Sequence, residues 1–214
     1  MSENEIDARD LRIARHEAGH LTVGRALGAA FGGATINENA ELNCGGMVWG
    51  PDFKSHFAGE TTSSVIEQID DLMPRDGDAR EAVADIYAHV FARVVELCAG
   101  SEAEVLECGD AWPAGDDRRQ EQQLAALIYS SPEAQAMFIE ACAAEARAIL
   151  RRHADVHAAL VAALIEHRTL DGAQIDETIG RAVAGRQIAQ EHERRRRWRA
   201  IETRAEQFEA ECRV

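Results

Sequence analysis

The chain has 214 residues, a hydrophobic fraction of 46%, a charged fraction of 29% and a formal net charge of −15. This length and composition are typical of a globular domain and exclude intrinsic disorder. The longest apolar run, residues 158–165, is far shorter than the ~20 residues of a membrane-spanning helix. The acidic start lacks the features of a signal peptide, and the acidic surface repels phosphate backbones. We therefore expect neither membrane nor nucleic acid as a partner.

The cysteines are odd in number and none forms a C-x-x-C pair. This pattern predicts reduced thiols that act as small buried hydrophobes, and hence a cytoplasmic location. It argues against a disulfide framework or a zinc site built from cysteine. The five residues are Cys44, Cys98, Cys108, Cys142 and Cys212.

Helical periodicity and capping signals predict most of the elements. In chain order we expect a helix over 7–27, short strands over 34–36 and 46–49, and further helices over 62–73, 78–107, 117–129, 132–152 and 155–167. A last helix should begin after Asp171, because Gln174 completes a capping box and Leu170 and Ile175 occupy the staple positions. The predicted fold is mainly α (α+β), with a small β-sheet or hairpin near residues 33–50.

Charge divides the chain unevenly. Residues 181–214 hold nine arginines and six glutamates, a net charge of +3, so residues 1–180 carry −18. This break predicts a body over 1–180 followed by a basic C-terminal helix over 181–214. Glutamates interleave with its arginines, which favours a solvated face. Apolar side chains recur there at steps of three and four, which fits either an oligomer contact or packing on the body: Trp198, Ile201, Ala205, Phe208 and Cys212.

The segment His16–His20 reads H-E-A-G-H and lies on the first predicted helix. Residues four apart share a helix face, so His16 and His20 can bind one Zn²⁺ through their imidazoles. Glu17 is displaced around the helix and can instead take a proton from a zinc-activated water that attacks a peptide carbonyl. The motif predicts zinc-dependent hydrolysis.

A catalytic zinc site needs a third protein ligand, and no further histidine follows at a suitable distance. His153 and His157 form another i,i+4 pair, but without the glutamate we expect solvated or capping roles for them. The residues alone leave the third ligand open among the acidic side chains of later helices: Glu102, Glu104, Asp110, Asp116 and Asp117.

Four stretches in order resemble the peptidase domain of the FtsH family of ATP-dependent zinc proteases, over about residues 14–179. The first is the zinc helix at 14–20, and the second, residues 98–104, is similar to the family's Gly-Gly-Arg-Ala-Ala-Glu helix. The third, residues 114–117 followed by Leu124 and Ala125, resembles its Ala-Ser-Asn-Asp segment. The fourth, residues 163–177, is close to its C-terminal signature.

The resemblance implies a zinc metallopeptidase with a mostly helical fold and a small sheet. It implies His16, His20 and an aspartate as zinc ligands, with Glu17 as the base. Asp117 is the expected aspartate because only it places Leu124 and Ala125 at the family's offsets, and Glu104 is expected to orient a ligand histidine. Substrate should pair with an edge strand, formed here by Gly46, Met47, Val48 and Trp49.

The sequence departs from that family in two ways, since it has no G-x-x-x-x-G-K-[ST] loop and no membrane segment. We therefore expect an endopeptidase that acts on unfolded or flexible protein chains, alone or with a separate ATPase or unfoldase, and with a possible homo-oligomeric assembly. The alternatives are a non-enzymatic module that binds zinc and peptides or regulates through the same fold, and an acidic helical interaction protein with a coincidental motif. Only the last predicts no bound metal.

Overall fold

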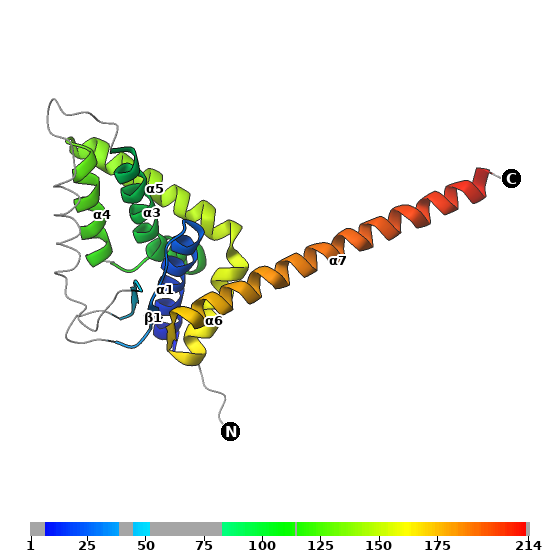
Figure 1. The fold of residues 1–214 in the computed structure, drawn as a ribbon, viewed down its shortest axis with the longest axis horizontal. Coiled ribbons are helices and arrows are strands. Elements are labelled where there is room, and N and C mark those ends of the chain that lie inside the picture. Colours follow the sequence, from blue (N-terminus) through cyan, green and yellow to red (C-terminus); the bar gives the residue numbers. More distant parts are fainter. Residues whose placement is uncertain (1–6, 39–44, 52–82, 114, 213–214) are drawn as a thin grey trace, which may run out of the picture.

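The computed structural model describes residues 7–38, 45–51, 83–113 and 115–212. Within these ranges the chain is mainly helical with one small antiparallel sheet (Figure 1), which confirms the predicted fold class. None of its helices is long and apolar enough to cross a membrane. The predicted helix over 62–73 lies outside the described residues. The helices are α1 (Ala8–Ala26), α3 (Val83–Cys108), α4 (Gly115–Ile128), α5 (Pro132–Arg152), α6 (Ala154–His167) and α7 (Gly172–Cys212).

Helix α1 runs through the middle of the body. Asp7 caps its start by accepting a hydrogen bond from the backbone N–H of Arg9 at 3.0 Å. Gly28, with φ at +91°, follows its last turn. Every residue from Glu17 to Gly24 is buried, as expected of a helix enclosed on all sides.

Two apolar clusters share α1. The first lies among α3, α4 and α5 and receives Val23 from α1. The second lies among α1, α6, the sheet and the first turns of α7, and receives Leu21 from the same helix. At the crossing of α1 and α3, a Cβ on Gly19 would lie 2.6 Å from the carbonyl oxygen of Ala99. Only small residues therefore allow this close approach.

The sheet has the order β2-β1-β3, with both pairs antiparallel. Its strands are β1 (Gly33–Thr35), β2 (Met47–Trp49) and β3 (Thr169–Asp171). The first two lie within one residue of the predicted strands. Strand β3 was not predicted, and it brings the start of α7 beside β1 through the pairing of Ala34 with Leu170. Among the described strands, β2 forms one edge of the sheet.

Helix α7 begins at the predicted capping box. The N–H of Gln174 donates to Asp171 Oδ1 at 2.8 Å, and the N–H of Asp171 donates to Gln174 Oε1 at 2.9 Å. Leu170 and Ile175 are both buried beside it. The helix then runs without a break from Gly172 to Cys212 and projects far beyond the body (Figure 1). The boundary predicted after residue 180 therefore falls inside a continuous helix.

The cysteines of the described residues are free thiols. Cys98 and Cys142 are buried, as predicted, and burial raises the pKa of Cys142 to about 12. Cys108 and Cys212 are exposed, so the prediction of burial was wrong for these two. Cys44 lies outside the described residues.

Candidate metal centre

His16 and His20 lie one turn apart on α1, with their ring centroids 4.8 Å apart and their planes at 72°. Gly100 on α3 makes room for both rings. A Cβ on Gly100 would lie 2.4 Å from His16 Nε2 and 2.6 Å from His20 Nε2, closer than real Cβ contacts allow. Any side chain at this position would push the imidazoles out of place.

Each imidazole is held by its other nitrogen. His20 Nδ1 lies 2.8 Å from the backbone carbonyl oxygen of Glu96, which only accepts, so Nδ1 carries the proton. His16 Nδ1 lies 2.8 Å from Glu104 Oε1. Burial disfavours a charged Glu104, but hydrogen bonds from His16, the Trp112 backbone and Arg12 outweigh it and lower its pKa. In the neutral imidazoles both Nε2 atoms thus carry lone pairs directed into the site.

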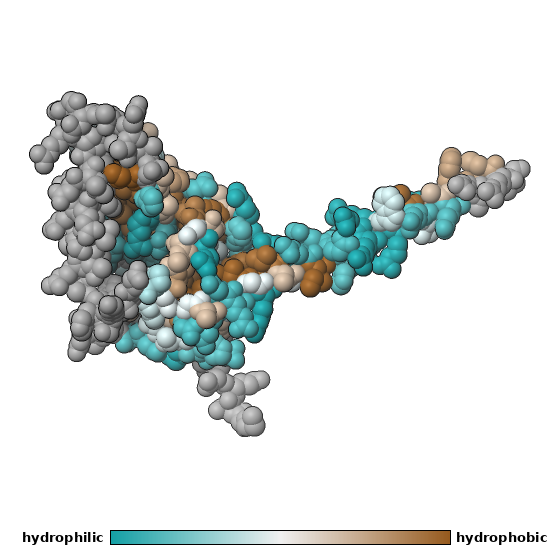
Figure 2. All heavy atoms as spheres, in the orientation of Figure 1, coloured by the Kyte–Doolittle hydropathy of each residue, from teal (hydrophilic) through white to brown (hydrophobic). Residues whose placement is uncertain are grey.

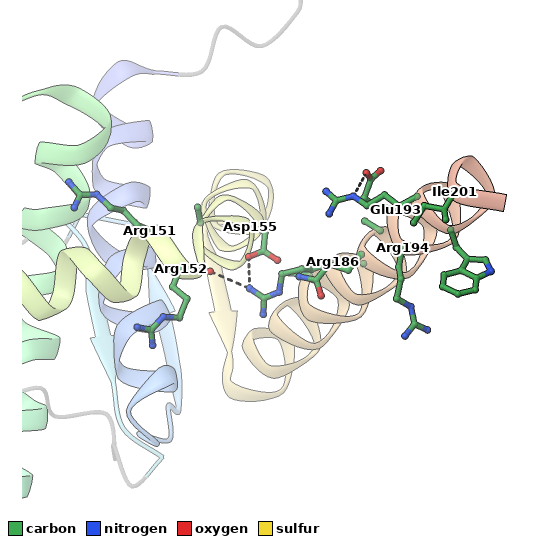
Figure 3. A pocket seen from close by; sticks show the side chains of 14 residues that line it. Arg151, Arg152, Asp155, Arg186, Glu193, Arg194 and Ile201 are labelled. Atoms are coloured by element: carbon green, nitrogen blue, oxygen red, sulfur yellow. Dashed lines mark hydrogen bonds and ion pairs between the residues drawn. The ribbon is translucent and has the colours of Figure 1, made fainter. Parts of the chain in front are cut away.

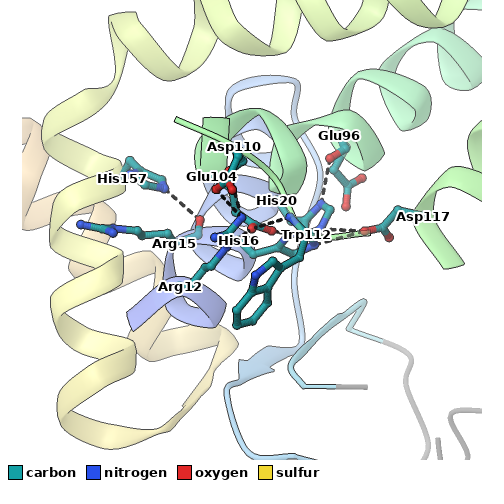
Figure 4. A network of polar contacts seen from close by, with 10 residues as sticks. All are labelled: Arg12, Arg15, His16, His20, Glu96, Glu104, Asp110, Trp112, Asp117 and His157. Atoms are coloured by element: carbon teal, nitrogen blue, oxygen red, sulfur yellow. Dashed lines mark hydrogen bonds and ion pairs between the residues drawn. The ribbon is translucent and has the colours of Figure 1, made fainter. Parts of the chain in front are cut away.

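Asp117, in the first turn of α4, faces these two nitrogens (Figure 4). Its Oδ2 lies 3.2 Å from His16 Nε2 and 3.5 Å from His20 Nε2. Ligand atoms of the three side chains all lie within 4.8 Å of one another, so they can hold a metal ion. Two imidazole nitrogens and one carboxylate oxygen form a donor set that suits zinc and leaves a coordination position open.

The other acidic candidates lie elsewhere. Asp116 accepts hydrogen bonds from Arg119 at 2.5 Å and from Gln120 at 2.6 Å on its own helix. Glu102 pairs with Arg147 at 2.8 Å. Asp110 is exposed and pairs with Arg12 at 2.9 Å. The structure therefore brings Asp117, and not these neighbours, to the two histidines.

The carboxylates around the two imidazoles favour a positive charge in the site. Burial opposes protonation of His16, but its hydrogen bonds to Asp117 and Glu104 outweigh burial and raise the pKa of His16 to about 10. Burial also works against a charged Asp117, yet His20 and His16 lower the pKa of that carboxyl well below its usual range. The carboxylates thus stabilise positive charge between them, which a protonated imidazole or a bound cation can supply.

Glu17 follows His16 on α1 and lies against the backbone that leads into β2. Its side chain is buried, and this burial raises the pKa of the carboxyl group. A Cβ on Gly46 would lie 2.5 Å from Glu17 Oε1, so the backbone that leads into β2 passes directly over the carboxylate. Of the predicted substrate-binding residues, Met47, Val48 and Trp49 form β2 itself, and all are half-buried.

A polar network around Arg12 was not predicted. Its guanidinium donates to Glu104 Oε2 at 2.5 Å and to the Asp110 carbonyl oxygen at 3.0 Å. The same group lies 4.6 Å from the centre of the Trp112 ring, a cation–π distance. The N–H of Trp112 also donates to Glu104 at 3.0 Å. The loop between α3 and α4 is thereby fixed beside the site (Figure 4).

His157 corrects the expectation of a solvated or capping role. It is buried, its Nε2 lies 3.0 Å from the carbonyl oxygen of Arg15, and its Nδ1 lies 3.0 Å from Glu107. Arg15 pairs with the same glutamate at 2.6 Å. His157 thus fixes the backbone next to His16. His153 is the junction residue between α5 and α6, and its side chain makes no capping hydrogen bond.

Comparison with known proteins adds no family to this geometry. Neither a scan against protein-family models nor a search of curated proteins finds a match for the chain.

Proposed function

We propose that this protein is a zinc-dependent endopeptidase that hydrolyses peptide bonds in unfolded or flexible protein chains. The observation that carries the proposal is the meeting of His16, His20 and Asp117 within 4.8 Å, with the Glu17 carboxylate on the next residue of the same helix. Residues from two helices, about one hundred positions apart, supply the parts that the H-E-x-x-H chemistry requires.

In this proposal the two histidines and Asp117 hold the zinc ion. Zinc, when bound, polarises the scissile carbonyl and activates a water molecule. Glu17 takes the proton of the attacking water and delivers it to the leaving amine. Burial raises the pKa of Glu17, which makes its carboxylate a stronger proton acceptor than a solvated glutamate.

The position of β2 supports an extended peptide as substrate. It is an edge among the described strands, and the backbone before it passes over Glu17. An extended chain can add to this edge through main-chain hydrogen bonds, which are largely independent of side-chain identity. A folded protein cannot present such a segment, so its cleavage would require a separate ATPase or unfoldase. Free exposed thiols at Cys108 and Cys212 support a reducing cytoplasmic setting.

Metal content and cleavage of casein together test the proposal. We expect about one equivalent of zinc in the purified protein, casein cleavage that stops with a chelator, and recovery when zinc is returned. Glu17→Gln should keep the zinc and reduce cleavage by about 10²–10⁴-fold, because an amide cannot take the proton. Bound zinc without cleavage would favour a non-enzymatic peptide-binding or regulatory module. Absence of bound metal would overturn both functions.

A further inference from the structure

The outer part of α7 carries large apolar side chains that are mostly exposed to solvent. Trp198, Ile201 and Phe208 are 63%, 59% and 67% exposed. Helix α7 packs on the body only near its start, through residues such as Ile175 and Val183. Figure 1 shows the remainder of the helix standing clear of every other element. An apolar stripe on a projecting helix marks a contact surface.

A groove lies where α7 leaves the body. It has a volume of about 1000 Å³, and it is lined by the junction of α5 and α6 and by one face of α7. Arg186 spans its floor, donating to Asp155 at 3.0 Å and to the carbonyl oxygen of Arg152 at 3.4 Å (Figure 3). On the α7 side the part of the groove next to the body holds the small residues Ala182, Gly185 and Ala189, and the outer part holds larger side chains, Trp198 and Ile201 among them. In Figure 2 apolar side chains continue from the body along this part of the helix.

We propose that the outer half of α7 from a second copy of this chain occupies the groove, in an antiparallel two-fold dimer. One register places Ile201 and Phe208 opposite small side chains, while Trp198 falls opposite His192 of the partner subunit. Ile201 of the partner subunit then lies opposite Ala189, and Phe208 of the partner subunit lies opposite Ala182. Large side chains entering the space above small ones are the basis of close helix packing.

Charge agrees with this register at its ends, whereas at the axis Arg195 falls opposite Arg195 of the partner subunit. Arg197, which pairs with Glu193 of its own chain at 3.0 Å, also falls opposite Glu193 of the partner subunit. Arg151 and Arg152, at the end of α5, form no side-chain ion pair with any described residue, and they border the groove. The incoming segment brings Glu202 and Glu206 to this basic rim. Opposite charges across a contact fix its register and orientation.

The proposed dimer has closed two-fold symmetry, so no contact surface is left to bind a third copy. Each copy offers one groove and one apolar outer helix, so a two-fold axis near residue 195 satisfies both copies at once. A parallel pairing would bury the apolar stripe against itself but would leave both grooves open. The antiparallel dimer accounts for the stripe and the groove together.

Mass measurement across a dilution series tests the dimer. We expect twice the chain mass of 23.4 kDa, and a single chain mass for the double variant Ile201→Asp with Phe208→Asp. Thr203→Asp is the matched control, because residue 203 lies about 200° around the helix from Ile201. Circular dichroism must show that both variants keep their helices. A single chain mass for the unaltered protein at every concentration, or a double variant that stays dimeric, would overturn the proposal.

Disulfide cross-linking tests the orientation. In a background with Cys44, Cys108 and Cys212 changed to serine, the register places Gly185 opposite Ala205 of the partner subunit. A Cβ on Gly185 meets nothing within 4 Å, so cysteine fits there. The double variant Gly185→Cys with Ala205→Cys should cross-link on mild oxidation, and each single variant should not, since its two copies lie about 30 Å apart. Cross-linking of Ala205→Cys alone would show a parallel dimer and contradict the proposal.

Discussion

Gly100 and His16 are so close that a single methyl group could not stand between them: a Cβ on Gly100 would lie 2.4 Å from His16 Nε2. The glycine belongs to α3, whereas the histidine belongs to α1. His16 Nε2, a candidate metal ligand, can therefore take its position only because residue 100 on α3 has no side chain.

Gly100→Ala should impair metal binding although alanine favours a helix. The added methyl group displaces both imidazoles, so we expect a loss of zinc affinity of at least ten-fold and a matching loss of cleavage. Gly180→Ala, on α7, is the control, because a Cβ there meets nothing within 4 Å. It should leave zinc binding unchanged and raise stability by about 0.5–1 kcal/mol. Zinc titration and thermal unfolding of both variants measure these effects, and equal zinc affinity would contradict the first.

Asp117→Ala and Asp116→Ala should separate metal binding from helix stability. Removal of Asp117 takes away a donor that faces both imidazoles, so zinc binding should weaken severely. Asp116 accepts its hydrogen bonds from Arg119 and Gln120 on its own helix, so its removal should cost about 1 kcal/mol or less. Metal analysis after dialysis, with chemical denaturation alongside, tests both. If Asp116→Ala lost the metal and Asp117→Ala kept it, the assignment would be wrong.

Glu104→Gln should weaken zinc binding by about 10–100-fold, because the carboxylate that orients His16 becomes a weaker, neutral partner. Glu102→Gln is a close control: it lies on the same helix and pairs with Arg147, away from the site. We expect it to retain full zinc affinity. Competition with a coloured zinc chelator measures both, and similar affinities for the two variants would exclude a special role for Glu104.

Gly46→Ala should slow cleavage without releasing the metal. The added Cβ would lie 2.5 Å from Glu17 Oε1. Either the carboxylate or the backbone just before β2 must therefore shift. Gly50→Ala, just beyond β2, adds a Cβ into open space and should cleave casein at the unaltered rate. Rates and zinc content measured together distinguish this effect from loss of zinc. A normal cleavage rate for Gly46→Ala would remove β2 from the proposed substrate path.

Local signals predicted the helices well because caps and turns act within a few residues. Ser131 caps α5 through the Ala134 N–H, and Asp171 with Gln174 starts α7. Strand β3 was missed because its three residues overlap that capping signal, and its pairing with β1 joins segments more than 130 positions apart. No local pattern reports such a contact.

The site was predictable only where its residues are neighbours in the sequence. His16, Glu17 and His20 form a short motif, whereas Asp117 was chosen only through the family resemblance, since the residues alone left five acidic candidates. Arg12 and Trp112 carried no signal, and the i,i+4 spacing of His153 and His157 led to the wrong role for His157. Their roles come from contacts between helices that the sequence pattern does not encode.

Helix α1 has a further consequence for the body. Because it contributes to both apolar clusters, Val23 to one and Leu21 to the other, no seam divides the body into halves that could unfold separately. Two of the three candidate metal ligands, His16 and His20, lie on this shared helix. Occupancy of the site should therefore protect backbone amides on both sides of α1 from solvent exchange, far beyond the metal's immediate neighbours.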